Sequence, residues 1–162
     1  VLLICNDAAM IEKVGKAVDT QLNLLPRKSI AQQALNNSKS ILVSNMDEAM
    51  LISNQYAPEH LIIAVDRAEV LAAQVVNAGS VFLGHYTPES AGDYASGTNH
   101  TLPTNGHARA YSGVSVDSFV KKVTFQQITQ EGIKEVGPTV IAMAEAEGLD
   151  AHANAVKIRI KK

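Results

Sequence analysis

The chain has 162 residues, with 14 Lys and Arg against 16 Asp and Glu, and a formal net charge of -2. This length allows one domain with its own hydrophobic core and a small appendage. The near balance of charge excludes a strongly basic surface, so neither nucleic acid nor an anionic membrane is an expected partner. No apolar run approaches the roughly 20 residues of a membrane-spanning helix. Cys5 is the single cysteine, which excludes an internal disulfide and is typical of a reducing, cytoplasmic compartment.

The beginning of the sequence suggests a piece of something larger. Val1 is not preceded by a methionine, and the apolar run 1–5 starts at once. A domain seldom begins inside a buried strand, so we expect this chain to be part of a longer protein. Proteolytic trimming is the alternative.

The first 84 residues alternate short apolar runs with amphipathic segments. Strands are predicted at 1–5, 40–43, 60–65 and 80–83, and helices at about 7–22, 29–36, 45–55 and 67–77. Gly79 is expected to close the last of these helices in a left-handed conformation. Strand-helix units repeated about every 20 residues predict an α/β fold, a Rossmann-like parallel sheet with helices on both faces.

Residues 85–113 are rich in Gly, Ser, Thr, Asn and His and have few aliphatic side chains. A long irregular segment inside a compact protein is usually functional. Its most polar part, 90–100, is expected to be a loop at the carboxyl end of the strand 80–83, where open α/β sheets bind ligands. Together these features predict a partial Rossmann-like α/β domain over 1–113.

Regular structure is expected again from residue 114. A strand is predicted at 122–127, a long helix at 130–146 with Thr129 as its cap, and a last helix at 151–158 with Asp150 as its cap. The region 114–162 is too small for an independent core. We therefore expect a small, mostly helical C-terminal extension that docks on the first part, on missing sequence or on another subunit.

The first candidate site is the Glu59-His60 pair, which follows Pro58. Imidazole groups titrate near neutral pH, and a neighbouring carboxyl group can share proton transfer with them. Successive side chains of a strand point to opposite faces, so these two meet only if the backbone bends, as Pro58 would allow. The alternative is a surface turn without a catalytic role.

Two further clusters carry metal-binding side chains. Asp93 and His100 offer a carboxylate and an imidazole, although their spacing fits no short metal motif. The alternative is a polar loop whose side chains satisfy its own backbone. Glu147 and His152 flank Gly148, which places them on different elements, and the alternative there is a simple junction between two helices.

Four segments together resemble histidinol dehydrogenase: APEHL at 57–61, AGSVFLGHYTPESAGDYASGTNHTLPT at 78–104, ARAYSGVSV at 108–116 and EGLDAHANAV at 147–156. The resemblance covers essentially the whole chain in order, and it is weakest over residues 1–40. The family enzyme oxidises L-histidinol to L-histidine through the aldehyde, with two NAD and one Zn²⁺ per site, and it works as a homodimer.

The resemblance implies a role for each candidate residue. Glu59 and His60 match the catalytic pair, in which His60 takes the hydroxyl proton and Glu59 helps to activate water. Asp93 and His152 match zinc ligands, and His152 matches the one donated by the partner subunit. The remaining pair, His100 and Glu147, match residues that hold the substrate. The substrate-binding set is His60, Asp93, His100, Glu147 and His152.

The resemblance also implies that important parts are missing. The family's two other zinc ligands and its NAD-contacting domain lie upstream of the matched region, so no cofactor-binding residue is expected here and the chain is expected to be inactive alone. Two alternatives stay open: a non-catalytic binding or dimerisation module with the same fold, and a dehydrogenase relative for another amino alcohol.

Overall fold

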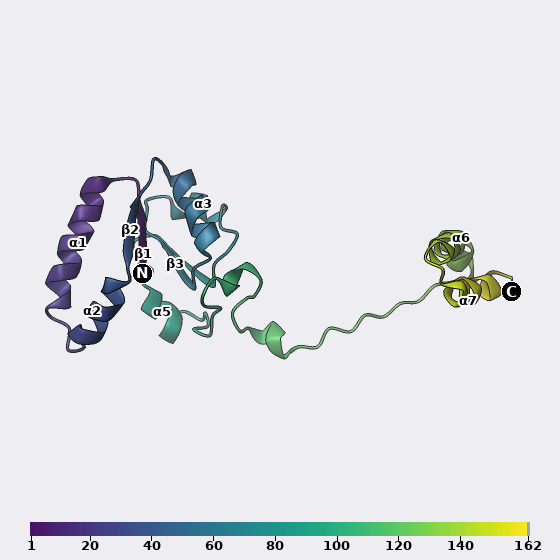
Figure 1. The fold of residues 1–162 in the computed structure, drawn as a ribbon. Helices are drawn as coiled ribbons and strands as arrows, with labels where there is room; N and C mark the ends of the chain where they lie inside the picture. The colour runs from purple at the N-terminus through teal and green to yellow at the C-terminus, as the bar shows by residue number, and fades with distance from the viewer. Residues whose placement is uncertain (162) are drawn as a thin grey trace. The chain divides into compact units, whose positions relative to one another are not determined.

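The computed structural model describes residues 1–161. They form two compact units, 1–119 and 120–161, and the first of these holds all the strands of the described chain (Figure 1). No helix in residues 1–161 combines the length and the apolar character needed to cross a membrane. The elements of the first unit are β1 (Leu2–Cys5), α1 (Ala8–Leu22), α2 (Lys28–Asn36), β2 (Lys39–Leu42), α3 (Met46–Tyr56), β3 (His60–Ile63), α4 (Ala68–Ala72), β4 (Ser80–Leu83), α5 (Glu89–Tyr94) and the short 3-10 helices η1 (His107–Arg109) and η2 (Val116–Phe119).

The predicted α/β class with parallel strands is confirmed. β1 pairs in parallel with β2, and β3 pairs in parallel with β4, so the hydrogen bonds join the strands in two pairs. Figure 1 shows α1 and α2 on one side of the first pair and α3 on the other. Each connection between paired strands runs through helices, as parallel pairing requires.

Side-chain caps fix where the helices start. The Asp7 side chain accepts a hydrogen bond from the Ala9 amide at 2.8 Å at the start of α1. At α3, the Asn45 side chain accepts from the Glu48 amide at 2.9 Å, and the Glu48 carboxylate accepts from the Ser44 amide at 2.7 Å. These bonds satisfy amides that the helix itself leaves unpaired.

One face of the second strand pair forms the core of this region. Ile63 is buried together with Met50 of α3 and Ala68 of α4, and Leu61 packs against them. Side chains alternate along a strand, so residues 61 and 63 share this apolar face while residue 60 belongs to the opposite one. The packing of β3 therefore determines the direction of His60.

The turn into β3 is held by a close backbone contact. α3 is capped at its C-terminus by Ala57, which is buried with φ +55, and the chain continues through Pro58 and Glu59. The amide of Gly79 donates to the Pro58 carbonyl and that of Ser80 to the Glu59 carbonyl, both at 2.9 Å. A Cβ on residue 79 would lie 2.5 Å from the Glu59 oxygen, so only glycine fits there.

Two expectations about residues 67–79 are corrected. The helix is shorter than predicted, because Asn54 takes the backbone groups that would continue it: its side chain binds the Gln74 carbonyl and the Val76 amide, both at 2.8 Å. Gly79 was expected to close the helix in a left-handed conformation, but its φ is not positive. Its lack of a side chain instead allows the close contact with the Glu59 backbone.

The second unit contains α6 (Gln130–Ala146) and α7 (Asp150–Ile160), which pack against each other. The predicted Thr129 cap is confirmed, since its side chain accepts from the Gly132 amide at 3.0 Å. The predicted Asp150 cap is wrong. α7 begins one residue earlier than predicted, so Asp150 is its first residue and Leu149 holds the cap position. An ion pair between Lys157 and Glu145 also links the helices.

The predicted strand at 122–127 is wrong. These residues form neither a strand nor a helix, and the apolar side chains of Val123 and Phe125 are exposed. The alternating pattern is correct for a strand, but an extended segment gains stability only from a hydrogen-bonded neighbour. In residues 1–161 the segment has none.

The contact at Gly79 yields a stability prediction. Substitution Gly79→Ala should lower the free energy of unfolding by about 1–3 kcal/mol, because the new methyl group forces the Glu59 backbone to move. Urea denaturation followed by circular dichroism measures this. The matched control is Gly15→Ala in α1, where a Cβ meets open space and about 0.5–1 kcal/mol of stabilisation is expected. Equal effects of the two substitutions would contradict the close contact.

Candidate functional site

The candidate site lies on the face of β3 and β4 that is opposite the apolar core. His60 pairs in register with Ser80, and Ile62 with Phe82, so His60 and Phe82 point to the same face. Their rings lie 6.0 Å apart between centroids and are tilted by 34°. Phe82 is buried and gives the imidazole of His60 a firm apolar support.

Helix α5 supplies the carboxylates of the site. Glu89 and Asp93 are separated by four residues and therefore share one side of this helix. The helix approaches the strands closely at Gly92, where a Cβ would lie 2.7 Å from the ring of Phe82 and 2.9 Å from the hydroxyl of Thr98. The absence of a side chain at residue 92 allows both carboxylates to reach His60.

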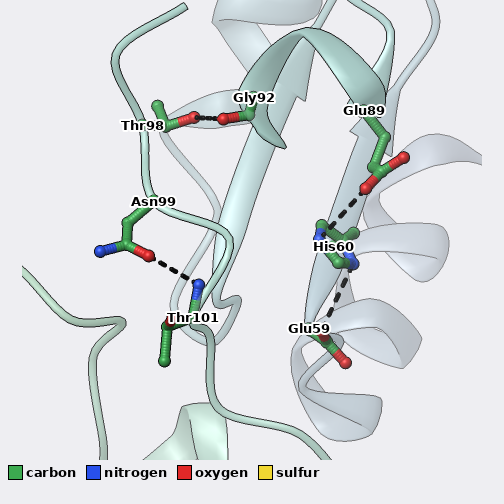
Figure 2. A network of polar contacts seen from close by, with 7 residues as sticks. All are labelled: Glu59, His60, Glu89, Gly92, Thr98, Asn99 and Thr101. Carbon is green, nitrogen blue, oxygen red and sulfur yellow. Dashed lines mark hydrogen bonds and ion pairs between the residues drawn. The ribbon is translucent and has the colours of Figure 1, made fainter. Parts of the chain in front are cut away.

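The imidazole of His60 lies between two carboxylates, as Figure 2 shows. Its Nδ1 is 3.9 Å from Oε1 of Glu59, and its Nε2 is 3.5 Å from Oε1 of Glu89. The Nε2 atom is buried and makes no hydrogen bond within residues 1–161. Glu59 and His60 thus approach each other although they are neighbours in the chain, because the backbone bends at Glu59, just before β3 begins.

The same region forms a candidate metal centre. Single donor atoms of His60, Glu89 and Asp93 lie within 4.8 Å of one another, and all three residues are half-buried. One imidazole nitrogen and two carboxylate oxygens are ligand types that Zn²⁺ accepts. The three side chains come from β3 and α5, which explains why no short sequence motif marks them.

The polar segment after α5 is organised partly by its own side chains. Thr98 donates its hydroxyl hydrogen to the Gly92 carbonyl at 3.1 Å, and the Asn99 side chain accepts from the Thr101 amide at 2.7 Å (Figure 2). This is the self-satisfied loop that the sequence left open as an alternative. Further along, the guanidinium of Arg109 donates to the Gln55 carbonyl and so ties the segment to the end of α3.

An open pocket of about 800 Å³ lies beside the cluster. It is lined by the start of β4, by residues 97–100 with Leu102, and by the stretch from Gly113 to Phe119. His100 is exposed and belongs to this pocket, whereas His60, Glu89 and Asp93 are outside its lining. The pocket and the cluster adjoin through Ser80, which pairs with His60.

The structure brings three of the predicted residues together within the first unit. Glu59, His60 and Asp93 converge. Glu147 and His152 lie in the second unit, where Glu147 is the C-terminal cap of α6 and His152 is on the first turn of α7, both exposed.

Sequence reasoning missed Glu89, and it misplaced the polar segment. The sequence did contain one signal for it. Glu89 lies four positions before Asp93, and this spacing places two acidic side chains on the same side of a helix. The segment was expected to be a loop at the carboxyl end of β4, but it contains α5, which folds back over the strand face. The carboxylates therefore meet His60, the first residue of β3.

Comparison with known proteins identifies the family. The family model described as histidinol dehydrogenase matches residues 1–160. The chain belongs to the histidinol dehydrogenase family. A histidinol dehydrogenase from Bacteroides thetaiotaomicron is 57% identical over 159 residues, which cover 98% of this chain and 37% of the relative. The chloroplastic histidinol dehydrogenase of Arabidopsis thaliana is 52% identical over 161 residues, 99% of this chain and 34% of the relative.

A solved structure supports the same assignment. The crystal structure of histidinol dehydrogenase from Elizabethkingia anophelis matches with a TM-score of 0.94 and 53% identity, over 99% of this chain and 37% of that one. The chain thus spans little more than a third of the length of the histidinol dehydrogenases that it matches.

The close approach at Gly92 yields a prediction for the site. Substitution Gly92→Ala should move α5 away from Phe82 and separate Glu89 and Asp93 from His60, because the new methyl group needs space that the ring occupies. Nuclear Overhauser contacts between the Phe82 ring and residue 92 measure the displacement. The matched control is Ser90→Ala on the exposed side of α5, which should leave the contacts around Phe82 unchanged. Unchanged contacts in Gly92→Ala would disprove the role of residue 92.

Proposed function

We propose that this chain is the C-terminal part of a zinc-dependent histidinol dehydrogenase, which oxidises L-histidinol through the aldehyde to L-histidine with two NAD. The observation that carries the proposal is the convergence of His60, Asp93 and Glu59 in a chain of this family. Because the chain spans 37% of its relative's length, we propose that the NAD site and the remaining zinc ligands belong to the rest of the enzyme.

His60 is the proposed base. In the first oxidation, the imidazole of His60 takes the hydroxyl proton of the substrate, and NAD held by the rest of the enzyme would accept the hydride from the alcohol carbon. Glu59 lies 3.9 Å from the same ring and is the proposed activator of water for the second oxidation. That water adds to the aldehyde, and oxidation of the hydrate to the carboxylate releases two protons and a second hydride, for which a second NAD would be the acceptor. Proton transfer of this kind requires an imidazole within reach of the reacting oxygen.

Asp93 is the proposed zinc ligand of the first unit. Its carboxylate is half-buried, and its neighbours offer only nitrogen and oxygen donors, which is a donor set that suits Zn²⁺. When bound, the ion would orient the amino and imidazole nitrogens of the substrate. His60 is close enough to be a ligand too, but a nitrogen bound to a metal has no lone pair left for a proton. The proposed function therefore assigns Asp93 to the metal and His60 to the base.

The remaining residues are assigned to substrate and subunit contacts. His100 and Glu147 are the proposed substrate-binding residues, and His152 is the proposed zinc ligand that a partner subunit donates. His152 is exposed on α7, as such a donated ligand needs to be. A homodimer is the assembly that this assignment requires, and a cytoplasmic location accords with the single cysteine.

Metal content tests the division between Asp93 and His60. The test protein is a full-length chimera in which this chain replaces the matched segment of the Bacteroides thetaiotaomicron enzyme. Asp93→Asn should lower zinc affinity by at least about 10–100-fold, because the ion loses a direct charged ligand and the loss of an outer partner alone costs that much. His60→Asn should leave the zinc content unchanged. Atomic absorption after dialysis measures both, and loss of zinc in His60→Asn would make His60 a ligand and not a base.

Steady-state kinetics test the base. In the same chimera, His60→Asn should lower kcat about 10²–10⁴-fold, because no other group accepts the hydroxyl proton. NADH formation from histidinol measures this, and the 162-residue chain alone should form none. His85→Asn is the matched control, since His85 is an exposed histidine paired with Asp66. Full activity of His60→Asn would refute the proposed role.

A further inference from the structure

Glu89 has no role in the function proposed above, although it is the carboxylate closest to the buried nitrogen of His60. Its Oε1 lies 3.5 Å from Nε2, whereas Glu59 lies 3.9 Å from Nδ1. The two carboxylates therefore face different nitrogens of one ring (Figure 2). Glu89 thus lies next to the nitrogen of His60 that Glu59 does not approach.

We propose that Glu89 is a positioning residue that holds the imidazole of His60 through its Nε2 side and so directs the ring for proton transfer. The proposal rests on the proposed function, which makes His60 the base. A carboxylate on one nitrogen of a histidine fixes the ring orientation and the tautomer and supports the positive charge that the ring gains.

The state of Nε2 supports this role. The atom is buried and has no hydrogen bond in residues 1–161, although buried polar atoms normally have a partner. Oε1 of Glu89 is within reach, at a distance slightly longer than an ordinary hydrogen bond. Catalytic hydrogen bonds in proteins without substrate are often long and shorten when the substrate binds. A small rotation of the Glu89 side chain would complete the bond.

The placement of Glu89 also supports it. The residue is on α5, which packs against Phe82 at Gly92, and Phe82 in turn packs against His60. His60 and the helix that carries Glu89 are therefore both held against the same buried ring. A constellation supported by packed neighbours keeps its geometry more accurately than one on a free loop. Asp93, one turn further along α5, is left for the metal.

The experiment compares three variants of the full-length chimera. Glu89→Gln should lower kcat for histidinol about 10–100-fold, with KM changed less than about twofold and the zinc content unchanged. Glu89→Asp keeps the charge and should recover part of the lost kcat. Asp66→Asn is the matched control, because it removes a carboxylate from another imidazole, the exposed His85 at 3.3 Å, and should leave kcat unchanged.

A spectroscopic measurement makes the test independent of turnover. With ¹⁵N-labelled histidine, the imidazole nitrogen signals of His60 should shift in Glu89→Gln and stay unchanged in Asp66→Asn. A role in folding alone would lower the thermal midpoint of Glu89→Gln and leave the His60 signals of the folded fraction unchanged, which would overturn the proposal.

Other outcomes also decide the matter. Loss of zinc in Glu89→Gln would make Glu89 a ligand, a raised KM with an unchanged kcat would make it a substrate contact, and unaltered kinetics would remove any role. Failure of the proposed function looks different, because His60→Asn would then keep full activity. If only the present inference fails, His60→Asn is inactive while Glu89→Gln is fully active.

Discussion

The site depends on the alternation of side chains along β3. Leu61 and Ile63 pack against Met50 and Ala68, which fixes one face of the strand to the core. His60 is consequently directed to the other face, where Phe82 and α5 meet it. A slip of one residue in the pairing with β4 would turn His60 into the apolar core. The packing of Leu61 and Ile63 in the core therefore also sets the direction of the proposed base, His60.

Two glycines allow the close backbone packing that surrounds His60. Gly79 lets β4 contact the Glu59 backbone, and Gly92 lets α5 rest on the Phe82 ring. In each case the neighbouring group occupies the space of a Cβ. The positions of three carboxylates around one imidazole thus follow from backbone packing.

The charge of the cluster explains its suitability for a cation. Glu59, Glu89 and Asp93 gather around His60, and no Lys or Arg forms an ion pair with these carboxylates in residues 1–161. Half-buried carboxylates without a cationic partner repel one another, and a divalent ion or a protonated imidazole relieves that repulsion. The acidic surroundings therefore favour positive charge in this region, whether it is carried by the imidazole of His60 or by a bound cation.

The sequence alone determined the α/β class and the start and end of most helices, because these follow from local periodicity and capping residues. Glu59, His60 and Asp93 were singled out through the resemblance to a family, and their roles stay proposals. The sequence did not determine that α5 forms within the polar segment, that α4 stops at Ala72, or that residues 122–127 remain without a strand partner. Those outcomes depend on contacts between distant residues: Phe82 with Gly92, Asn54 with Gln74 and Val76, and the presence or absence of a neighbouring strand. The position of Glu89 also depends on such a contact, since only the packing of α5 against β4 brings its carboxylate to the buried nitrogen of His60.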